Sequence, residues 1–311
     1  MKQASKRKRI GGFSLIELMV AMVITALIVT ILISITGVAT DTWTRSRAEL
    51  RASRQAKTFI DTLAKDLESM VSRRGNNFEW LHAEVDSNAD LPTVVRDNAG
   101  SGDAVSLTFI TAATDRYFGQ IGAPSDKGGD ASCAAYRLRH QNPISDGADE
   151  QTDTFVVYRS LVNPNVTFQD LLGQPNLKVA FQPFEDEVED KANFICENVH
   201  QFEMTFLVEV TETVEEGGIE KIVRRTVRVP LLSEGSGKDF RLKGNGIETN
   251  AAPNGVDADV LAAGRLRGVE LSVSVLSDAG VSRMNAADGL TPDDYARNVF
   301  HYSRVVEVPS Q

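Results

Sequence analysis

The chain has 311 residues, of which 42% are hydrophobic and 24% charged, so it is long enough for one large or two modest domains and is not disordered by composition. Its formal net charge is −10, although the first 12 residues carry only basic charges, so the remainder is more acidic than the total. This balance argues against a surface that binds nucleic acid without sequence preference, because neutralising phosphates requires clustered Lys and Arg.

A long apolar segment follows the basic leader, residues 1–12. Residues 13–38 contain one charged side chain, Glu17, and at about 1.5 Å per residue a helix of this length exceeds the roughly 30 Å hydrocarbon core of a bilayer. A cleaved secretory signal would have a shorter apolar run and a small-residue cleavage site, which residues 39–47 match poorly. We therefore expect a transmembrane helix that stays attached to the chain. Basic residues flank it on both sides, so charge counting leaves its orientation open.

The residues around the start of this span, KRKRIGGFSLIEL, resemble the class III signal of type IV pilins and type II secretion pseudopilins. The resemblance implies that a prepilin peptidase cuts between Gly12 and Phe13, and that Phe13 is then N-methylated. It further implies that Glu17, which has no evident partner before cleavage, pairs with the new amino terminus of a neighbouring subunit, so that two buried charges compensate each other. In the monomer the alternative is that the carboxylate reaches the lipid headgroups, since it lies about one turn from the cut end.

Helical periodicity continues beyond the span. Charged residues fill the positions between apolar ones, and Arg73, Arg74 and Gly75 indicate where the helix ends. The sequence therefore predicts one helix over residues 13–74, whose amphipathic second half packs on a sheet. The apolar residues recur at steps of three and four: Ala52, Ala56, Phe59, Ile60, Leu63, Leu67, Met70 and Val71.

After residue 75 the pattern changes to alternation with a period of two. It is clearest over 201–211, where a turn at 215–218 leads into 219–231 and predicts a hairpin. We expect an α+β protein, with the long N-terminal helix packed on a largely antiparallel β-rich globular domain of residues 75–311. Further strands are predicted at 104–112, 133–140, 154–162, 177–181, 268–277 and 300–308, and long connections at 82–103, 119–131 with 141–152, and 233–265.

The size of this domain is large for a major pilin, and Ser34 stands where many major pilins have a proline. The order of elements resembles the J-type pseudopilins of type II secretion and the W-type minor pilins. The resemblance implies a structural minor subunit in the bacterial inner membrane, with its globular domain in the periplasm, that joins the tip or initiating complex of a filament. Its partners would be other pilin-like subunits, the prepilin peptidase, the inner-membrane assembly platform and membrane lipid, without nucleic acid.

Residues that could carry chemistry are scattered. His82, His140, His200 and His301 lack ligand spacing, and neither a GxSxG elbow nor a P-loop occurs, so we expect no enzyme and no metal centre. The acidic clusters at 126–130 and 185–190 lack the spacing of a calcium loop, and solvated loops are the simpler interpretation, although some pseudopilins use calcium.

Cys133 and Cys196 form either one disulfide or two separate buried thiols. The alternative functions are a ligand-binding minor pilin, acting as an adhesin or in DNA uptake, and a membrane-anchored periplasmic enzyme.

Overall fold

The computed structural model describes residues 14–87, 89, 91–96, 102–113, 130–143, 153–216, 219–233, 237–287 and 289–309. The chain divides into two compact units, residues 1–49 and 50–311. The boundary lies inside helix α1, Leu15–Glu68, which is continuous over 54 residues. The first unit consists, in its described part, of the N-terminal portion of this helix, whereas the remainder of α1 belongs to the core of the second unit.

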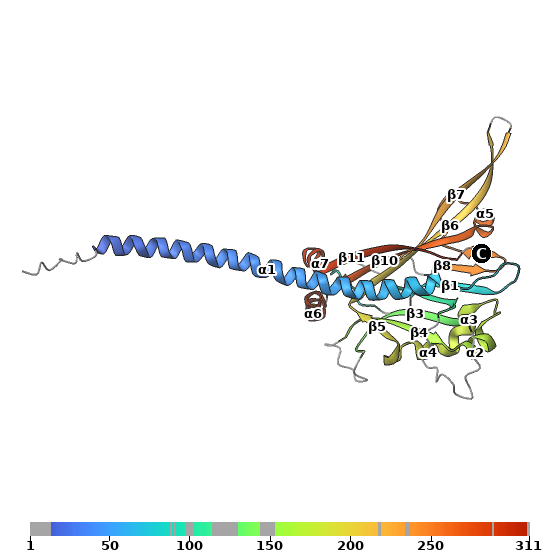
Figure 1. The fold of residues 1–311 in the computed structure, drawn as a ribbon, viewed down its shortest axis with the longest axis horizontal. Coiled ribbons are helices and arrows are strands. Elements are labelled where there is room, and N and C mark those ends of the chain that lie inside the picture. The colour runs from blue at the N-terminus through green and yellow to red at the C-terminus, as the bar shows by residue number, and fades with distance from the viewer. Residues whose placement is uncertain are drawn as a thin grey trace, which may run out of the picture. The chain divides into compact units, whose positions relative to one another are not determined.

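The described part of the second unit contains two antiparallel sheets (Figure 1), which confirms the expected α+β architecture. The seven-stranded sheet has the order β5-β4-β3-β2-β1-β8-β9, and the four-stranded sheet has the order β11-β10-β6-β7. The strands are β1 Glu79–Asp86, β2 Ala104–Thr111, β3 Ser132–Gln141, β4 Thr154–Val162, β5 Phe194–Glu197, β6 Val199–Glu216, β7 Ile219–Leu231, β8 Asp239–Lys243, β9 Gly246–Thr249, β10 Arg265–Leu276 and β11 Val299–Glu307.

The main core lies where α1 meets both sheets. Phe59 of α1 packs edge-on against Phe202 of β6 at 4.9 Å and contacts Tyr136 of β3 at 6.2 Å, both measured between ring centroids. Phe206 of β6 stacks on Phe240 of β8 at 3.9 Å and so joins the two sheets directly. The amphipathic half of α1 therefore packs on sheet, as its apolar stripe predicts.

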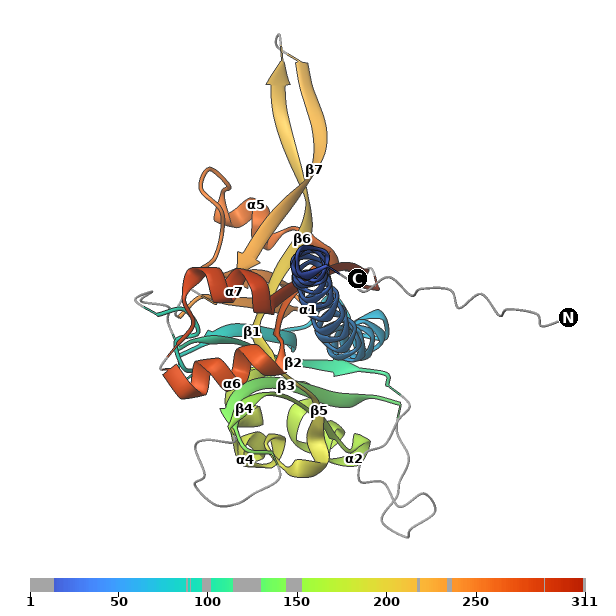
Figure 2. The same cartoon turned by 90° about the vertical axis from the view of Figure 1, so that its left-hand side faces the viewer.

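A second apolar cluster lies on the other face of the seven-stranded sheet, where Ile110 and Val156 pack under the segment 164–193 (Figure 2). Single helical turns make up this segment: α2 Pro164–Val166, a π-helical turn Thr167–Leu171, α3 Leu177–Phe181, a 3-10 turn Gln182–Phe184, α4 Glu185–Val188 and a 3-10 turn Lys191–Asn193. The remaining helices are α5 Ala258–Ala262, α6 Asp278–Ala287 and α7 Pro292–Asn298.

Helix α1 ends six residues before the predicted end at Arg74. Met70 instead forms an isolated β-bridge with Thr111, and the Val71 N–H donates to the Ile110 carbonyl at 2.9 Å. The backbone after Glu68 therefore pairs with β2 although the apolar spacing of the sequence continues, because pairing across the fold is decided by contacts that local periodicity does not contain.

The prediction of a strand at 177–181 was wrong. Asn176 caps a helical turn there by accepting a hydrogen bond from the Val179 N–H at 3.1 Å. Leu177 and Phe181, four residues apart, are buried together, whereas Val179 between them is 60% exposed. The alternation of apolar residues in LKVAF fits a strand and a single helical turn equally well, and the cap decides.

The other errors concern short elements. The expected connection 233–265 contains β8, β9 and α5, and the expected connection 82–103 begins inside β1. Strand β5 and helices α6 and α7 were not predicted. These elements are short, and β8 is held by pairing with β1, more than 150 residues earlier in the chain, which local patterns do not reveal.

Asp66 is a buried charge that attaches α1 to the seven-stranded sheet. Arg159 of β4 donates to both carboxylate oxygens, from Nε at 2.8 Å and from Nη2 at 2.9 Å. The Tyr136 hydroxyl of β3 donates to the same carboxylate at 2.5 Å. Burial and the adjacent Asp66 charge raise the pKa of Tyr136 well above its usual value, so the phenol keeps its proton as the donor.

We expect Asp66→Asn to lower the free energy of unfolding by about 3 kcal/mol, because it removes the negative charge from the buried Asp66–Arg159 ion pair. Asp61→Asn is the matched control on the same helix, since Asp61 is half exposed in its ion pair with Arg304 and should change stability by about 1 kcal/mol or less. Urea unfolding of the full chain in detergent micelles measures both. Equal effects of the two substitutions would contradict the assignment.

A second buried charge, Glu79, joins β1 to β8 and to the start of α3. Arg241 donates to both of its carboxylate oxygens, at 2.8 and 2.9 Å, and the Leu177 N–H donates at 2.7 Å. Burial raises the pKa of Glu79, but hydrogen bonds from Arg241, His82 and Leu177 outweigh it and hold this pKa at about 2. Burial lowers the pKa of His82, but hydrogen bonds with Glu79 and Glu84 outweigh it, so this pKa is raised.

The contribution of this network to the free energy of unfolding should depend on pH both in acid and above pH 6.5. The lowered pKa of Glu79 gives a contribution that is complete above pH 4.5 and is lost as the pH falls towards about 2. The raised pKa of His82 gives a contribution that is complete below pH 6.5 and is lost as the pH rises above it. Urea midpoints across this range should fall less steeply in acid for Glu79→Gln, and less steeply in base for His82→Gln, than for wild type. The exposed-site control Glu68→Gln should follow wild type, and parallel curves for all four proteins would refute the prediction.

Candidate functional site

The first turn of α1 contains a reciprocal cap between Ser14 and Glu17. The Ser14 backbone N–H donates to the Glu17 carboxylate at 2.8 Å, and the Glu17 N–H donates to the Ser14 hydroxyl at 3.2 Å. This is a capping box, in which two of the backbone donors that have no partner inside the helix are satisfied. The expectation that Glu17 lacks a partner before cleavage was therefore wrong, and the S-x-x-E spacing was the signal for it. Gly12 and Phe13 lie outside the described residues.

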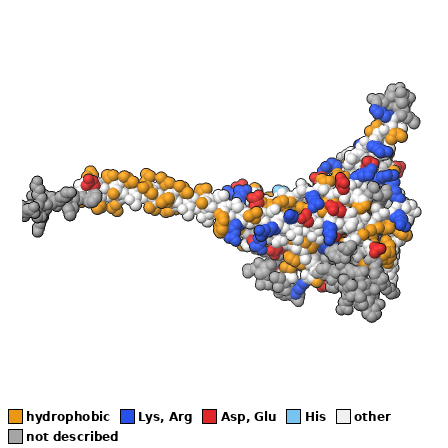
Figure 3. Space-filling view, viewed as in Figure 1, with side chains coloured by type: hydrophobic (Ala, Val, Ile, Leu, Met, Phe, Trp, Pro, Cys, Tyr) orange, Lys and Arg blue, Asp and Glu red, His pale blue; other side chains and the backbone are white. Residues whose placement is uncertain are grey.

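Apolar side chains cover most of the face of the first part of α1 that Figure 3 shows. Large hydrophobic residues from Leu15 to Val38 are between 47% and 79% exposed, and the helix is long and apolar enough to cross a membrane. The threonine hydroxyls in this stretch are satisfied inside the helix, because they donate to the carbonyl four residues earlier, as Thr25 does to Ala21 and Thr30 to Ala26. Threonines that need no water for their hydroxyl groups suit a lipid environment.

The polar end of this apolar stretch begins at Asp41. Trp43 is 60% exposed, and the Arg47 guanidinium lies over its ring at 4.7 Å from the ring centroid. Aromatic and basic residues of this kind are enriched where a helix leaves the hydrocarbon. The order of charge, apolar surface and aromatic residue along α1 therefore matches a single membrane anchor.

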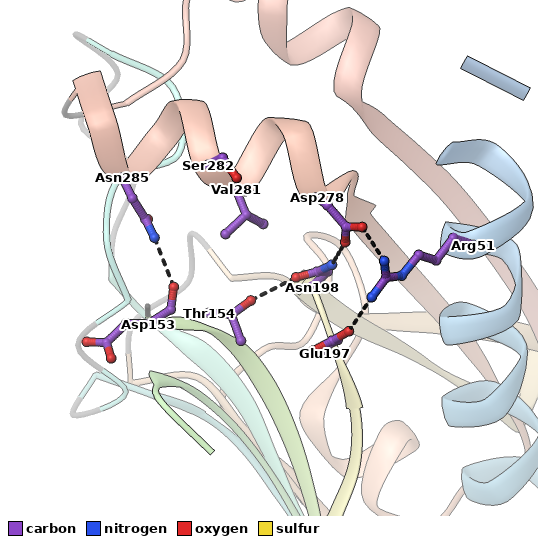
Figure 4. Close-up of a pocket in the computed structure, with 9 residues that line it drawn as sticks. All are labelled: Arg51, Asp153, Thr154, Glu197, Asn198, Asp278, Val281, Ser282 and Asn285. Carbon is purple, nitrogen blue, oxygen red and sulfur yellow. Dashed lines mark hydrogen bonds and ion pairs between the residues drawn. The ribbon is translucent and has the colours of Figure 1, made fainter. Parts of the chain in front are cut away.

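The second unit contains a polar pocket of about 320 Å³ between α1, the β5–β6 junction and α6 (Figure 4). Arg51 donates to Glu197 at 3.0 Å and also binds Asp278, while Asn198 donates to Asp278 at 2.8 Å. Thr154 donates in turn to Asn198 at 2.7 Å. These polar groups satisfy one another across four elements, so the arrangement ties α1 to β4, to the β5–β6 junction and to α6.

The four histidines are not brought together as a ligand set. His82 contacts Glu79, His140 packs edge-on against Phe155, His200 contacts Tyr295, and His301 contacts Ser274. Within the described part of the chain, no group of three or more His, Cys, Asp or Glu side chains is arranged to hold a metal ion.

Carboxylates of the acidic cluster 185–190 bind arginines of β3. Glu185 accepts hydrogen bonds from Arg137 at 2.6 and 3.1 Å, and Glu189 accepts one from Arg139 at 2.7 Å. These carboxylates therefore neutralise two arginines of the sheet. Of the cluster 126–130, only Asp130 is among the described residues, so neither the solvated loop predicted there nor the calcium alternative is tested.

The two cysteines are separate buried thiols and form no disulfide. Cys133 of β3 belongs to the apolar cluster under the short helical turns, whereas Cys196 of β5 belongs to the main core on the other face of the sheet. Side chains on opposite faces of one sheet point apart, so a bond between them is not compatible with this fold. Of the two alternatives left open by the sequence, one disulfide or two separate buried thiols, the structure therefore has the two thiols.

Comparison with known proteins gives one match. The family described as "Prokaryotic N-terminal methylation motif" matches residues 7–33. No curated protein and no solved structure shows significant similarity to the chain. The matched residues contain the predicted cleavage site, the Ser14–Glu17 cap and the apolar surface of α1, and they confirm the resemblance drawn from the sequence. Residues 7–33 thus carry the prokaryotic N-terminal methylation motif, which supports a type IV pilin-like protein.

Proposed function

We propose that this protein is a minor structural subunit of a type II secretion pseudopilus or a type IV pilus, related in role to the J-type pseudopilins or W-type minor pilins. The observation that carries the proposal is the methylation motif at residues 7–33, placed at the start of an uninterrupted apolar helix. Minor status is supported by the size of the second unit and by Ser34 in place of a helix-breaking proline. The second unit lies in the periplasm, and the helix anchors it in the inner membrane.

Processing of the chain creates the assembly site. A prepilin peptidase cuts after Gly12, where the missing Cβ allows close approach to the backbone. The α-amine of Phe13 then becomes the first group of the mature chain and is N-methylated. Glu17 lies one helical turn away and is held by its bond to the Ser14 N–H, so its carboxylate is already oriented when a neighbouring subunit arrives.

Assembly pairs the two charges. In a lipid-embedded helix bundle an isolated carboxylate or ammonium group is costly, and the pair is much less so. The Glu17 carboxylate of one subunit accepts hydrogen bonds from the Phe13 amine of the next, which fixes the relative height of the two helices. The apolar faces around Leu18 and Met19, both exposed in this structure, supply the packing contacts.

The mature protein should begin with N-methylated Phe13. Mass spectrometry of its N-terminal peptide, after expression with the cognate peptidase, measures both the cut and the added methyl group. Gly12→Val should reduce cleavage by more than about tenfold, because a β-branched side chain crowds the scissile bond. Gly11→Ala is the matched control and should be cut normally. Recovery of the intact leader on wild-type protein would contradict the proposal.

The charge of Glu17 can be separated from its role as a cap. Glu17→Gln keeps a side chain that completes a capping box, but it removes the negative charge. We expect normal insertion and cleavage, with co-purification of other subunits bearing the same motif reduced by more than about tenfold, since a buried amine loses its counter-ion. Ser14→Ala weakens the cap, keeps the charge and should co-assemble. If Glu17→Gln co-assembles like wild type, the charge-pair mechanism is wrong.

A further inference from the structure

Strand β7 is the outermost strand of the four-stranded sheet and has one open edge. Its inner edge pairs with β6 over its whole length, whereas its outer edge pairs with no strand among the described residues. Pro230 near its C-terminal end lacks an N–H, so the edge able to pair runs from Lys221 to Val229, about 30 Å. An open edge of this length presents a row of backbone donors and acceptors to another chain.

The far part of the β6–β7 hairpin has no support from the rest of the sheet. Pairing of β10 with β6 stops at Glu209, and β6 from Val210 to Glu216 pairs only with β7. Figure 1 shows this part of the hairpin extending past the end of β10. Ile222, on this extension, is 71% exposed. A two-stranded ribbon is marginally stable by itself, and a third strand would both stabilise it and cover this side chain.

The charges of β7 and its neighbours indicate which charge an added third strand should carry. Between Lys221 and Val229 all the charged residues of β7 are basic, and β6 beside it is acidic: Arg225 pairs with Glu212 at 2.6 Å. On the other face Glu209 of β6 lies between Arg267 of β10, at 3.0 Å, and Arg224 of β7, whose charge also acts on it. Arg228 of β7 also binds Glu270 of β10. The basic side chains of β7 thus lie beside acidic side chains of the neighbouring strands, with Arg267 of β10 on the far side of Glu209.

A strand added beside β7 should carry acidic side chains. Opposite charges on directly facing strands stabilise a sheet, and like charges destabilise it. The same rule disfavours pairing of β7 with β7 of a second copy, because Arg224, Arg225 and Arg228 would face basic side chains. Charge therefore disfavours pairing of this edge with β7 of a second copy and favours pairing with a negatively charged strand.

We propose that the outer edge of β7, from Lys221 to Val229, binds an extended acidic segment of a partner protein as an added β-strand. This interface is independent of the proposed function, because it uses β6, β7 and β10 and none of the N-terminal motif. Either one can fail while the other stands. Strand β6 itself defines the recognised pattern, since its sequence VEVTETVEE, Val208–Glu216, is the acidic strand that β7 already pairs with on its inner edge.

The probe is a free peptide of sequence VEVTETVEE, and its control is VKVTKTVKK, in which each Glu is Lys. Binding to the full chain in detergent micelles is followed by fluorescence anisotropy, and the site is located by hydrogen exchange. We expect the acidic peptide to slow exchange of β7 amides between Lys221 and Val229, and to bind at least tenfold more tightly than the basic peptide. The difference should shrink as salt is raised, because these charges are exposed.

Two variants test the charges. Arg224→Gln with Arg228→Gln should abolish the preference for the acidic peptide, whereas Arg283→Gln, an exposed arginine paired with Asp294 on another part of the second unit, should keep it. Unchanged exchange of β10 amides shows that the double variant is folded. The proposal is overturned if the acidic peptide leaves β7 exchange unchanged, or if both peptides bind equally. It is also overturned if β7 is protected by increasing protein concentration alone, which would make a second copy the occupant.

Discussion

A single buried carboxylate determines how α1 lies on the globular domain. Asp66 is held by both nitrogens of an Arg159 fork and by the Tyr136 hydroxyl, so three elements meet at one charge. A helix turned about its axis would break this buried ion pair, which is strongly destabilising. The Asp66 carbonyl also accepts a hydrogen bond from Thr111 of β2, and four residues later Met70 forms a β-bridge with the same threonine. The rotation of the helix and the place where it ends are therefore fixed together.

Helix α1 serves two environments with one backbone conformation. Its first part is apolar all round, with threonine hydroxyls satisfied inside the helix, and this surface suits lipid or other apolar helices. Its second part has one apolar stripe, because its other faces meet water. The two proposed partner surfaces differ in chemistry. The N-terminal helix offers apolar contacts and one charge, whereas the β7 edge offers backbone hydrogen bonds and basic side chains.

The Ser14–Glu17 cap changes how the carboxylate in the apolar segment is understood. It is not an unpartnered charge awaiting cleavage, because it already satisfies a backbone donor at the start of the helix. A cap of this kind holds the side chain in one rotamer, and less conformational entropy is then lost when a second donor binds. Glu17 thus both completes the cap of the helix and is the residue proposed to receive a neighbouring subunit.

The sequence by itself determined the features that depend on local order. The leader, the cleavage motif and the apolar span are contiguous, and the hairpin of β6 and β7 follows from alternation and a short turn. Only the tertiary structure decided the rest. Asp66 reads as one polar residue among several on an amphipathic helix, although its spacing from Leu63 and Met70 places it on the buried stripe. Strand β8 exists because it pairs with β1, and the helical turn at 177–181 exists because Asn176 caps it. The two cysteines are kept apart because a sheet lies between them, a separation that distance along the chain does not encode.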